Sequence, residues 1–224
     1  MNVSMTNAPE LIVMLTYNDF TVKNAAEIFE VCKNSKAKYW GLKEHPLARE
    51  ELKKLYARMK ECGKTTLLEV VSYTEEEGLE GASIAVECGC DILMGTRYFD
   101  SIHDYCKQHN MRYMPFVGRV EGRPSVLSGE IDDMVAEAKS YLDKGVYGID
   151  LLGYRYTGDK AKLYQAFKQS IDAPLCMAGS IDSYERLSEV RAIAPWAFTI
   201  GSAFFDHKFG DTFAEQIDAV CDFM

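Results

Sequence analysis

The stretch PLCMAGSIDSYERLSEVRAIAPWAFTIGSAFF, residues 174–205, contains two short apolar runs that both end in Gly-Ser. The first pair is Gly179-Ser180 and the second is Gly201-Ser202. Between them, the segment SIDSYERL opens a helical pattern, so the stretch predicts a strand, a helix and a second strand. Two strands joined in this way lie parallel, because parallel neighbours need a long crossover connection.

The same unit recurs along the whole chain. Apolar runs begin at Leu11, Lys38, Thr66, Asp91, Arg112, Gly148, Pro174 and Ala197, and their starts lie 21 to 28 residues apart, except for one gap of 36. Residues 22–35, 48–63 and 130–145 lie between runs and carry apolar residues three and four positions apart, which is the helical period. Eight such units predict an α/β fold, a single (β/α)8 TIM barrel over residues 1–224.

An open doubly wound sheet is the alternative, but it expects a G-x-G-x-x-G motif after the first strand. The chain has LTYNDFT, residues 15–21, at that place. The one long gap contains GRVEGRPSVLSG, residues 118–129, after the fifth strand. Insertions at the carboxyl ends of barrel strands usually serve the functional site.

Composition restricts the partners and the compartment. The 224 residues are 47% hydrophobic and carry a formal net charge of −9, with acidic and basic residues interspersed. Nucleic acids and anionic membrane surfaces need basic patches, so we expect neither as a partner. No apolar run reaches the roughly 18 residues of a membrane span. The start MNVSMTNAPE lacks the features of a signal peptide, and seven scattered cysteines suggest no disulfide framework, so we expect a cytoplasmic protein.

The two Gly-Ser pairs predict a phosphate site. Strands seven and eight of a (β/α)8 barrel often end in loops that bind phosphate through backbone N–H groups. Glycine allows close approach and positive φ, and the start of a helix favours negative charge. We expect Gly179, Ser180, Gly201 and Ser202 to face one another around the anion. Glycine also serves tight turns, so purely structural turns stay open as the alternative.

AGSIDSYERL, IGSAFF and the eight-unit layout resemble the ribulose-phosphate-binding barrel superfamily, with Ser180 where a second glycine is usual. That group contains sugar-phosphate epimerases, barrels of histidine and tryptophan biosynthesis, and phosphosugar decarboxylases, so the resemblance implies a phosphorylated small-molecule substrate. The chain lacks the paired aspartates of the histidine-pathway isomerases and the His pair and metal site of pentose-phosphate epimerases. It has EVVSY, residues 69–73, where the decarboxylases carry D-x-K-x-x-D. No subgroup's activity therefore transfers.

Alternation along the strands selects the candidate catalytic residues. In KYWGLK the bulky Trp40 and Leu42 should face the helices, which leaves Lys43 inside the barrel. The same argument places Glu69 of TLLEVV and Asp150 of GIDLLG inside. Charges in a closed interior are costly unless they are paired or used. We predict Lys43 as the electrophile, Glu69 as general base and Asp150 as an acid on the opposite side, and an internal salt-bridge network remains the alternative.

Other polar residues follow strands at the same face. Candidate substrate-binding residues are His45, Asn18, Arg119 and Arg155. Asp19 is assigned as a cap for the helix that begins near Val22. No His or carboxylate pattern indicates a metal, and we expect no cofactor.

Three functions stay open. The preferred one is an isomerase or epimerase that moves a proton next to a carbonyl of a small sugar phosphate. The second is an aldolase or lyase that forms a Schiff base on Lys43, and the third is a non-catalytic regulatory barrel that binds a phosphorylated ligand. The oligomeric state is not fixed by the sequence, and a homodimer is one of the assemblies left open.

Overall fold

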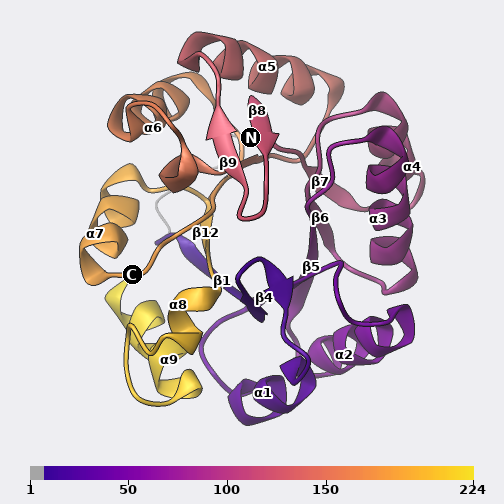
Figure 1. The fold of residues 1–224 in the computed structure, drawn as a ribbon, viewed down its shortest axis with the longest axis vertical. Helices are drawn as coiled ribbons and strands as arrows, with labels where there is room; N and C mark the ends of the chain where they lie inside the picture. Colours follow the sequence, from indigo (N-terminus) through magenta and orange to yellow (C-terminus); the bar gives the residue numbers. More distant parts are fainter. Residues whose placement is uncertain (1–7) are drawn as a thin grey trace.

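Eight parallel strands form one sheet in the computed structural model, which describes residues 8–224. The strand order is β10-β11-β12-β1-β4-β5-β6-β7. The two ends of this order meet, because Phe116 forms a parallel bridge with Asp150 and the Asp150 N–H donates to the carbonyl of Pro115 at 3.0 Å. The sheet therefore curls into a nearly closed ring surrounded by helices (Figure 1), and the predicted (β/α)8 barrel is confirmed.

All eight predicted strands are present. They are β1 (Glu10–Met14), β4 (Tyr39–Lys43), β5 (Thr65–Val70), β6 (Ile92–Gly95), β7 (Arg112–Met114), β10 (Ile149–Leu151), β11 (Leu175–Met177) and β12 (Ala197–Ile200). The helices are α1 (Ala25–Cys32), α2 (Arg49–Glu61), α3 (Glu75–Glu87), α4 (Asp100–Gln108), α5 (Ile131–Lys144), α6 (Lys160–Ser170), α7 (Tyr184–Ile193), α8 (Ser202–Phe205) and α9 (Phe213–Phe223), with a 3-10 turn η1 (Gly153–Arg155). The extent of the domain over residues 1–224 stays a prediction, since residues 1–7, on which the expected absence of a signal peptide also falls, lie outside the described part.

Helix ends follow local sequence. Gly145 ends α5 with a left-handed φ of 97°, a conformation that glycine adopts at little cost. Thr212 and Glu215 form a reciprocal capping box at the start of α9, in which each side chain accepts from the other residue's N–H. No helix among residues 8–224 combines the length and apolar character needed to cross a membrane.

Side chains sort by strand parity as alternation predicts. The inner cluster consists of Ile12, Met14, Leu67, Ile92, Met94, Met114, Cys176 and Ala197. Trp40 and Leu42 belong instead to the large outer cluster between strands and helices, as do Ile149 and Leu151. At the amino-terminal end of the barrel, Trp196 makes edge-to-face contacts with Tyr39 and Tyr147 at 5.4 and 5.9 Å between ring centroids. Apolar packing therefore fills this end and the middle of the barrel.

Two antiparallel hairpins lie at the other, carboxyl-terminal end. The first consists of β2 (Thr16–Tyr17) and β3 (Phe20–Thr21), and the second of β8 (Arg119–Glu121) and β9 (Val126–Ser128). The second hairpin is the insertion after the fifth strand, and it extends from the α5 side toward the middle of the ring (Figure 1). The N–H of Ser125, at its tip, donates to Asp19 of the first hairpin at 3.2 Å. The two hairpins thus meet over the mouth of the barrel.

Candidate active site

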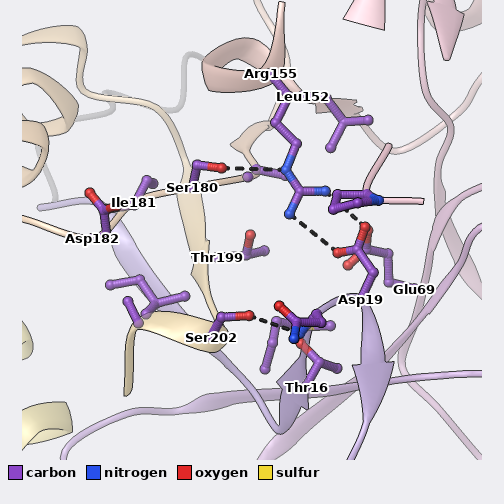
Figure 2. A pocket seen from close by; sticks show the side chains of 18 of the residues that line it. Thr16, Asp19, Glu69, Leu152, Arg155, Ser180, Ile181, Asp182, Thr199 and Ser202 are labelled. Carbon is purple, nitrogen blue, oxygen red and sulfur yellow. Dashed lines mark hydrogen bonds and ion pairs between the residues drawn. The ribbon is translucent and has the colours of Figure 1, made fainter. Parts of the chain in front are cut away.

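A cavity of about 280 Å³ opens at the carboxyl ends of the strands. Its lining combines residues from both hairpins, from the ends of β4 and β5, and from the loops after β10, β11 and β12: Met14, Thr16, Asn18, Asp19, Lys43, Glu69, Pro124, Leu152, Arg155, Ala178, Gly179, Ser180, Ile181, Asp182, Thr199, Ile200, Gly201, Ser202, Ala203 and Asp206. Figure 2 shows Ser180 and Ser202 on either side of Thr199, with Arg155 and Asp19 facing them. The size suits a small molecule.

Lys43 lies at the bottom of this cavity between two carboxylates. Its Nζ atom is 3.2 Å from Asp19 Oδ1 and 3.2 Å from Glu69 Oε1. Lys43 and Glu69 are direct partners in the register of β4 and β5, which explains why two strand ends place them together. The Thr21 hydroxyl is 2.8 Å from both the N–H and the carbonyl oxygen of Lys43 and fixes the end of β4. The prediction that Lys43 and Glu69 point inside is confirmed, and their chemical roles stay predictions.

The charges of this group stabilise one another. Burial acts to lower the pKa of the Lys43 ammonium, but the negative charges of Glu69 and Asp19 outweigh it and raise the pKa above its ordinary value. Burial acts to raise the pKa of Asp19, but Lys43 and Arg155 hold it well below the usual range. Lys43 is therefore cationic and Asp19 anionic near neutral pH. Lys43 donates one hydrogen bond, to Asp19, and forms an ion pair with Glu69, so its ammonium group keeps N–H groups for a ligand.

Asp19 corrects the sequence analysis, which assigned it to helix capping. The helix α1 starts at Ala25 with Asn24 as its N-cap, so Asp19 lies too far upstream. Asn18 and Asp19 instead form the left-handed turn between β2 and β3, with φ of 49° and 66°. This turn directs Asp19 into the cavity, where only 6% of its surface is exposed.

Arg155 from η1 binds the other side of Asp19. Its two terminal nitrogens donate to Asp19 Oδ2 at 2.9 Å and Oδ1 at 3.2 Å, the paired geometry that guanidinium and carboxylate favour. Its Nε atom donates to Ser180 Oγ at 3.4 Å (Figure 2). Arg155 thus connects the acidic bottom of the cavity to the loop after β11, and it still has N–H groups for a ligand.

The two Gly-Ser pairs lie on the same cavity, as predicted. Gly179 and Ser180 both have positive φ, 87° and 53°, and Gly201 is packed so closely that a Cβ atom would lie 2.9 Å from the carbonyl oxygen of Thr16. Among residues 8–224, the backbone N–H groups of these four residues donate to no protein acceptor. Unpaired amides around a cavity are suited to an anion. Phosphate binding there stays a prediction.

Two candidate residues are not brought to the cavity. His45 has the same parity as Lys43, but β4 ends at Lys43, so the alternation stops and the side chain is exposed. Arg119 is on β8 with Val120 buried beside it, and it faces outward, where it pairs with Glu121 at 2.8 Å. Asn18 does line the cavity, and its N–H donates to Ser202 Oγ at 3.0 Å. Both corrections have the same cause. The alternation along a barrel strand ends with that strand, and it does not apply to a separate hairpin such as β8–β9.

Asp150 lies beneath the cavity rather than on its lining. It is level with Cys176 and Phe116, and 1% of its surface is exposed. In the part of the chain that the structure describes, neither of its carboxyl oxygens has a hydrogen-bond partner. Burial and then the negative charge of Glu69 raise the pKa of Asp150 well above its ordinary value. Asp150 is therefore buried in the barrel interior, where its raised pKa favours the protonated form and a ligand in the cavity does not contact it directly.

Asp150→Asn is expected to stabilise the protein at pH 7. Because the pKa is raised in the folded state, folding takes up a proton at pH values between the ordinary value of 3.8 and the raised one, so the contribution of Asp150 to stability falls as pH rises through that range. The amide needs no such proton, and the free energy of unfolding should increase on the order of 1–3 kcal/mol, the scale of a buried polar penalty. Urea unfolding at pH 7 and pH 4 measures this, with the gain vanishing at pH 4. An equal gain at both pH values would contradict a raised pKa for Asp150.

Several lining residues were missed by the sequence analysis. Thr16, Thr199, Asp182 and Asp206 line the cavity beside the predicted residues. Thr199 faces inward by the same parity as Ala197, so its alternation within AFTIGS could have identified it. The two aspartates lie in loops, where no period applies. Within residues 8–224, no group of three or more His, Cys, Asp or Glu side chains is placed to hold a metal ion.

No protein-family model matches the chain, and no curated protein matches its sequence. Solved structures match its fold. A structure named as native KDPGal has a TM-score of 0.68 at 13% identity, covering 95% of this chain and 93% of its own. The N-acetylmannosamine-6-phosphate 2-epimerase from Clostridium perfringens has a TM-score of 0.63 at 10% identity, covering 87% of this chain and 86% of its own. The glycerol uptake operon antiterminator regulatory protein from Listeria monocytogenes has 0.59 at 18% identity, covering 90% and 96%.

These similarities define the class of fold. The structures that the chain resembles are (β/α)8 barrels of the ribulose-phosphate-binding type. The chain therefore has the (β/α)8 barrel fold of these structures, and the fold implied by the resemblance of AGSIDSYERL and IGSAFF is confirmed. Most of the similar structures are enzymes, and at least one is a regulatory protein.

Proposed function

We propose that the protein is an isomerase or epimerase of a small sugar phosphate that moves a proton next to a carbonyl group. The observation that carries the proposal is the Lys43–Glu69 pair, which lines the same cavity as the two Gly-Ser loops. One end of the cavity thus has donors for a phosphate and the other has a base beside a cation. The similar structures include proteins whose names specify sugar-phosphate chemistry, which supports the same substrate class.

The phosphate is held at the rim in this proposal. The N–H groups of Gly179, Ser180, Gly201 and Ser202 donate to its oxygens, and the Ser180 and Ser202 hydroxyls lie beside them. Arg155 supplies positive charge from the adjacent η1 turn. Fixing the phosphate here positions the remainder of the molecule toward Lys43, and such positioning is a large part of catalysis.

The proton transfer takes place at the bottom of the cavity. The Glu69 carboxylate removes a proton from the carbon next to the carbonyl, and the electrons of that C–H bond form an enediolate. A free N–H of Lys43 donates to the oxygen on which negative charge develops, a stabilisation that is stronger in the transition state than in the substrate. Protonated Glu69 then returns the proton to the former carbonyl carbon, while the proton of the adjacent hydroxyl passes to the oxygen that Lys43 contacts, and the new carbonyl forms on the neighbouring carbon to give the isomer. Return to the opposite face of the same carbon, which gives the epimer, needs a second proton donor.

The Schiff-base alternative is weakened by the charge of Lys43. An amine attacks a carbonyl only when it is unprotonated. The carboxylates of Glu69 and Asp19, 3.2 Å away on two sides, raise the pKa of Lys43 instead of lowering it. A cationic Lys43 fits an electrophile that donates a hydrogen bond.

The test is proton exchange with solvent. We expect the protein in deuterium oxide to incorporate deuterium next to the carbonyl of one member of a panel of pentose and hexose phosphates, as observed by proton NMR. Glu69→Gln should abolish the exchange and retain ligand binding. Borohydride should trap no adduct on Lys43. Binding without exchange by any member would favour the regulatory alternative, and a borohydride adduct would favour the aldolase.

A further inference from the structure

The lining of the cavity is rich in negative charge. Its ionisable side chains are Asp19, Glu69, Asp182 and Asp206, against Lys43 and Arg155. Asp182 pairs with Arg186 at 2.9 Å, and Asp206 accepts a hydrogen bond from the Tyr17 hydroxyl at 3.3 Å, both at the exposed rim. The bottom of the cavity therefore depends on the remaining four groups for its charge balance.

Those four groups already balance one another. Lys43 contacts Asp19 and Glu69 at 3.2 Å, and Arg155 contacts Asp19 through both terminal nitrogens. Asp19 and Lys43 are nearly buried, with side-chain exposures of 7% and 6%. Among the described lining residues, no cation at the bottom is left without an acidic partner. A ligand carboxylate at this depth would add an unbalanced negative charge within a few ångströms of two others, where screening by water is weak.

The same groups suit an uncharged polyhydroxy compound. The carboxylate of Glu69 accepts hydrogen bonds from hydroxyl groups, and the Thr16 and Thr199 hydroxyls accept or donate. Lys43 keeps an N–H group for a carbonyl oxygen. The rim accommodates a dianionic phosphate because its unpaired backbone N–H groups donate hydrogen bonds and Arg155 lies beside them.

We infer that the site selects phosphorylated compounds whose other end is uncharged, an aldose or ketose monophosphate, against the corresponding sugar-acid or keto-acid phosphates, and that Asp19 sets this selectivity. The inference rests on the proposed binding of the ligand's phosphate by the two Gly-Ser loops. It identifies the class of compound whose other end then reaches Lys43. Asp19 is the deciding residue because its single carboxylate contacts both cations at once. It thereby occupies the positions at which a substrate carboxylate would bind.

The test compares ligands that differ only at one end. Ribose 5-phosphate and 5-phosphoribonate form one pair, and glucose 6-phosphate and 6-phosphogluconate form a second, each titrated calorimetrically at pH 7.5 with inorganic phosphate as the reference ligand. We expect the neutral member of at least one pair to bind about tenfold or more tightly than its acid partner, from like-charge repulsion. If both acids bind the wild-type protein as tightly as their neutral partners or more tightly, the inference is overturned and the proposed phosphate site is unaffected. Binding of none of these ligands, phosphate included, would overturn both.

Variants test which residues determine the preference for the neutral ligand. Asp19→Asn should lower the preference for the neutral ligand to about threefold or less, because Lys43 and Arg155 then lose the carboxylate that both of them contact. Glu69→Gln removes a negative charge at the same depth and should act in the same direction, which keeps the test open if Asp19→Asn fails to fold. Asp182→Asn is the matched control at the rim and should leave the preference unchanged. An unchanged preference in both deep variants would refute the role of Asp19 and its neighbour.

Discussion

Lys43→Met is expected to lower the turnover of the protein's substrate by about 10²-fold or more, the scale of removing a main electrostatic contact of a transition state. The thioether cannot donate to an enediolate oxygen, and no other cation among the described residues lies between Glu69 and Asp19. Inorganic phosphate should still bind, because its donors belong to the loops after β11 and β12 and to Arg155. Steady-state kinetics and a phosphate titration of the same variant measure the two effects separately.

Folding of this variant requires its own control. Removing Lys43 leaves two nearly buried carboxylates with less opposite charge, and breaking such a network typically costs about 3–5 kcal/mol. The double variant Lys43→Met/Glu69→Gln removes one charge of each sign, so it should recover much of the stability while remaining inactive. Full turnover by folded Lys43→Met would reject Lys43 as the electrophile. A double variant that is stable and still binds the substrate would separate the catalytic role from that of an internal salt-bridge network.

The barrel was predictable because its determinants are periodic. Each strand is a short apolar run, each helix has its own period, and the near-constant spacing determines their number. The same period of two correctly directed Lys43 and Glu69 inward, and their pairing follows from neighbouring strands in register. The Gly-Ser loops were found for a related reason, since the ends of adjacent parallel strands lie at one edge.

Asp19 was not predictable from local sequence, because its role consists of contacts with distant residues. Lys43 is 24 positions away and Arg155 is 136 positions away. An Asn-Asp pair after a strand is as consistent with a helix cap as with a hairpin turn. Only the left-handed turn between β2 and β3 decides between them.

The depth of a side chain within the barrel was the second property that alternation along the strands could not predict. Alternation states which side of a strand a residue faces, and it treats Glu69 and Asp150 alike. The structure separates them, because Glu69 pairs with Lys43 at the carboxyl end of the barrel and Asp150 lies level with Cys176 below the cavity. The consequence is chemical, since one carboxyl group faces the cavity and the other is buried below it with a raised pKa.

Gly179→Leu is expected to weaken the binding of phosphorylated ligands by about 10²-fold and to leave the barrel folded. Gly179 has a φ of 87°, which L-residues rarely adopt, and a Cβ atom there would lie 3.0 Å from Cγ of Arg155. The added side chain would displace the guanidinium and fill the space in front of the loop amides, so donors and charge are lost together. Left-handed strain costs of order 1–3 kcal/mol, which a typical domain stability of about 5–15 kcal/mol tolerates.

Gly145→Leu separates that strain from the loss of binding. Gly145 ends α5 with a similar φ of 97°, and no atom lies within 4 Å of a Cβ built on it. Both variants should therefore lose comparable stability in thermal unfolding, and only Gly179→Leu should lose affinity in a titration with phosphate or a sugar phosphate. Equal affinities in the two variants would show that the loop after β11 is a structural turn, since a phosphate held by its amides could not remain bound once a side chain occupied its place.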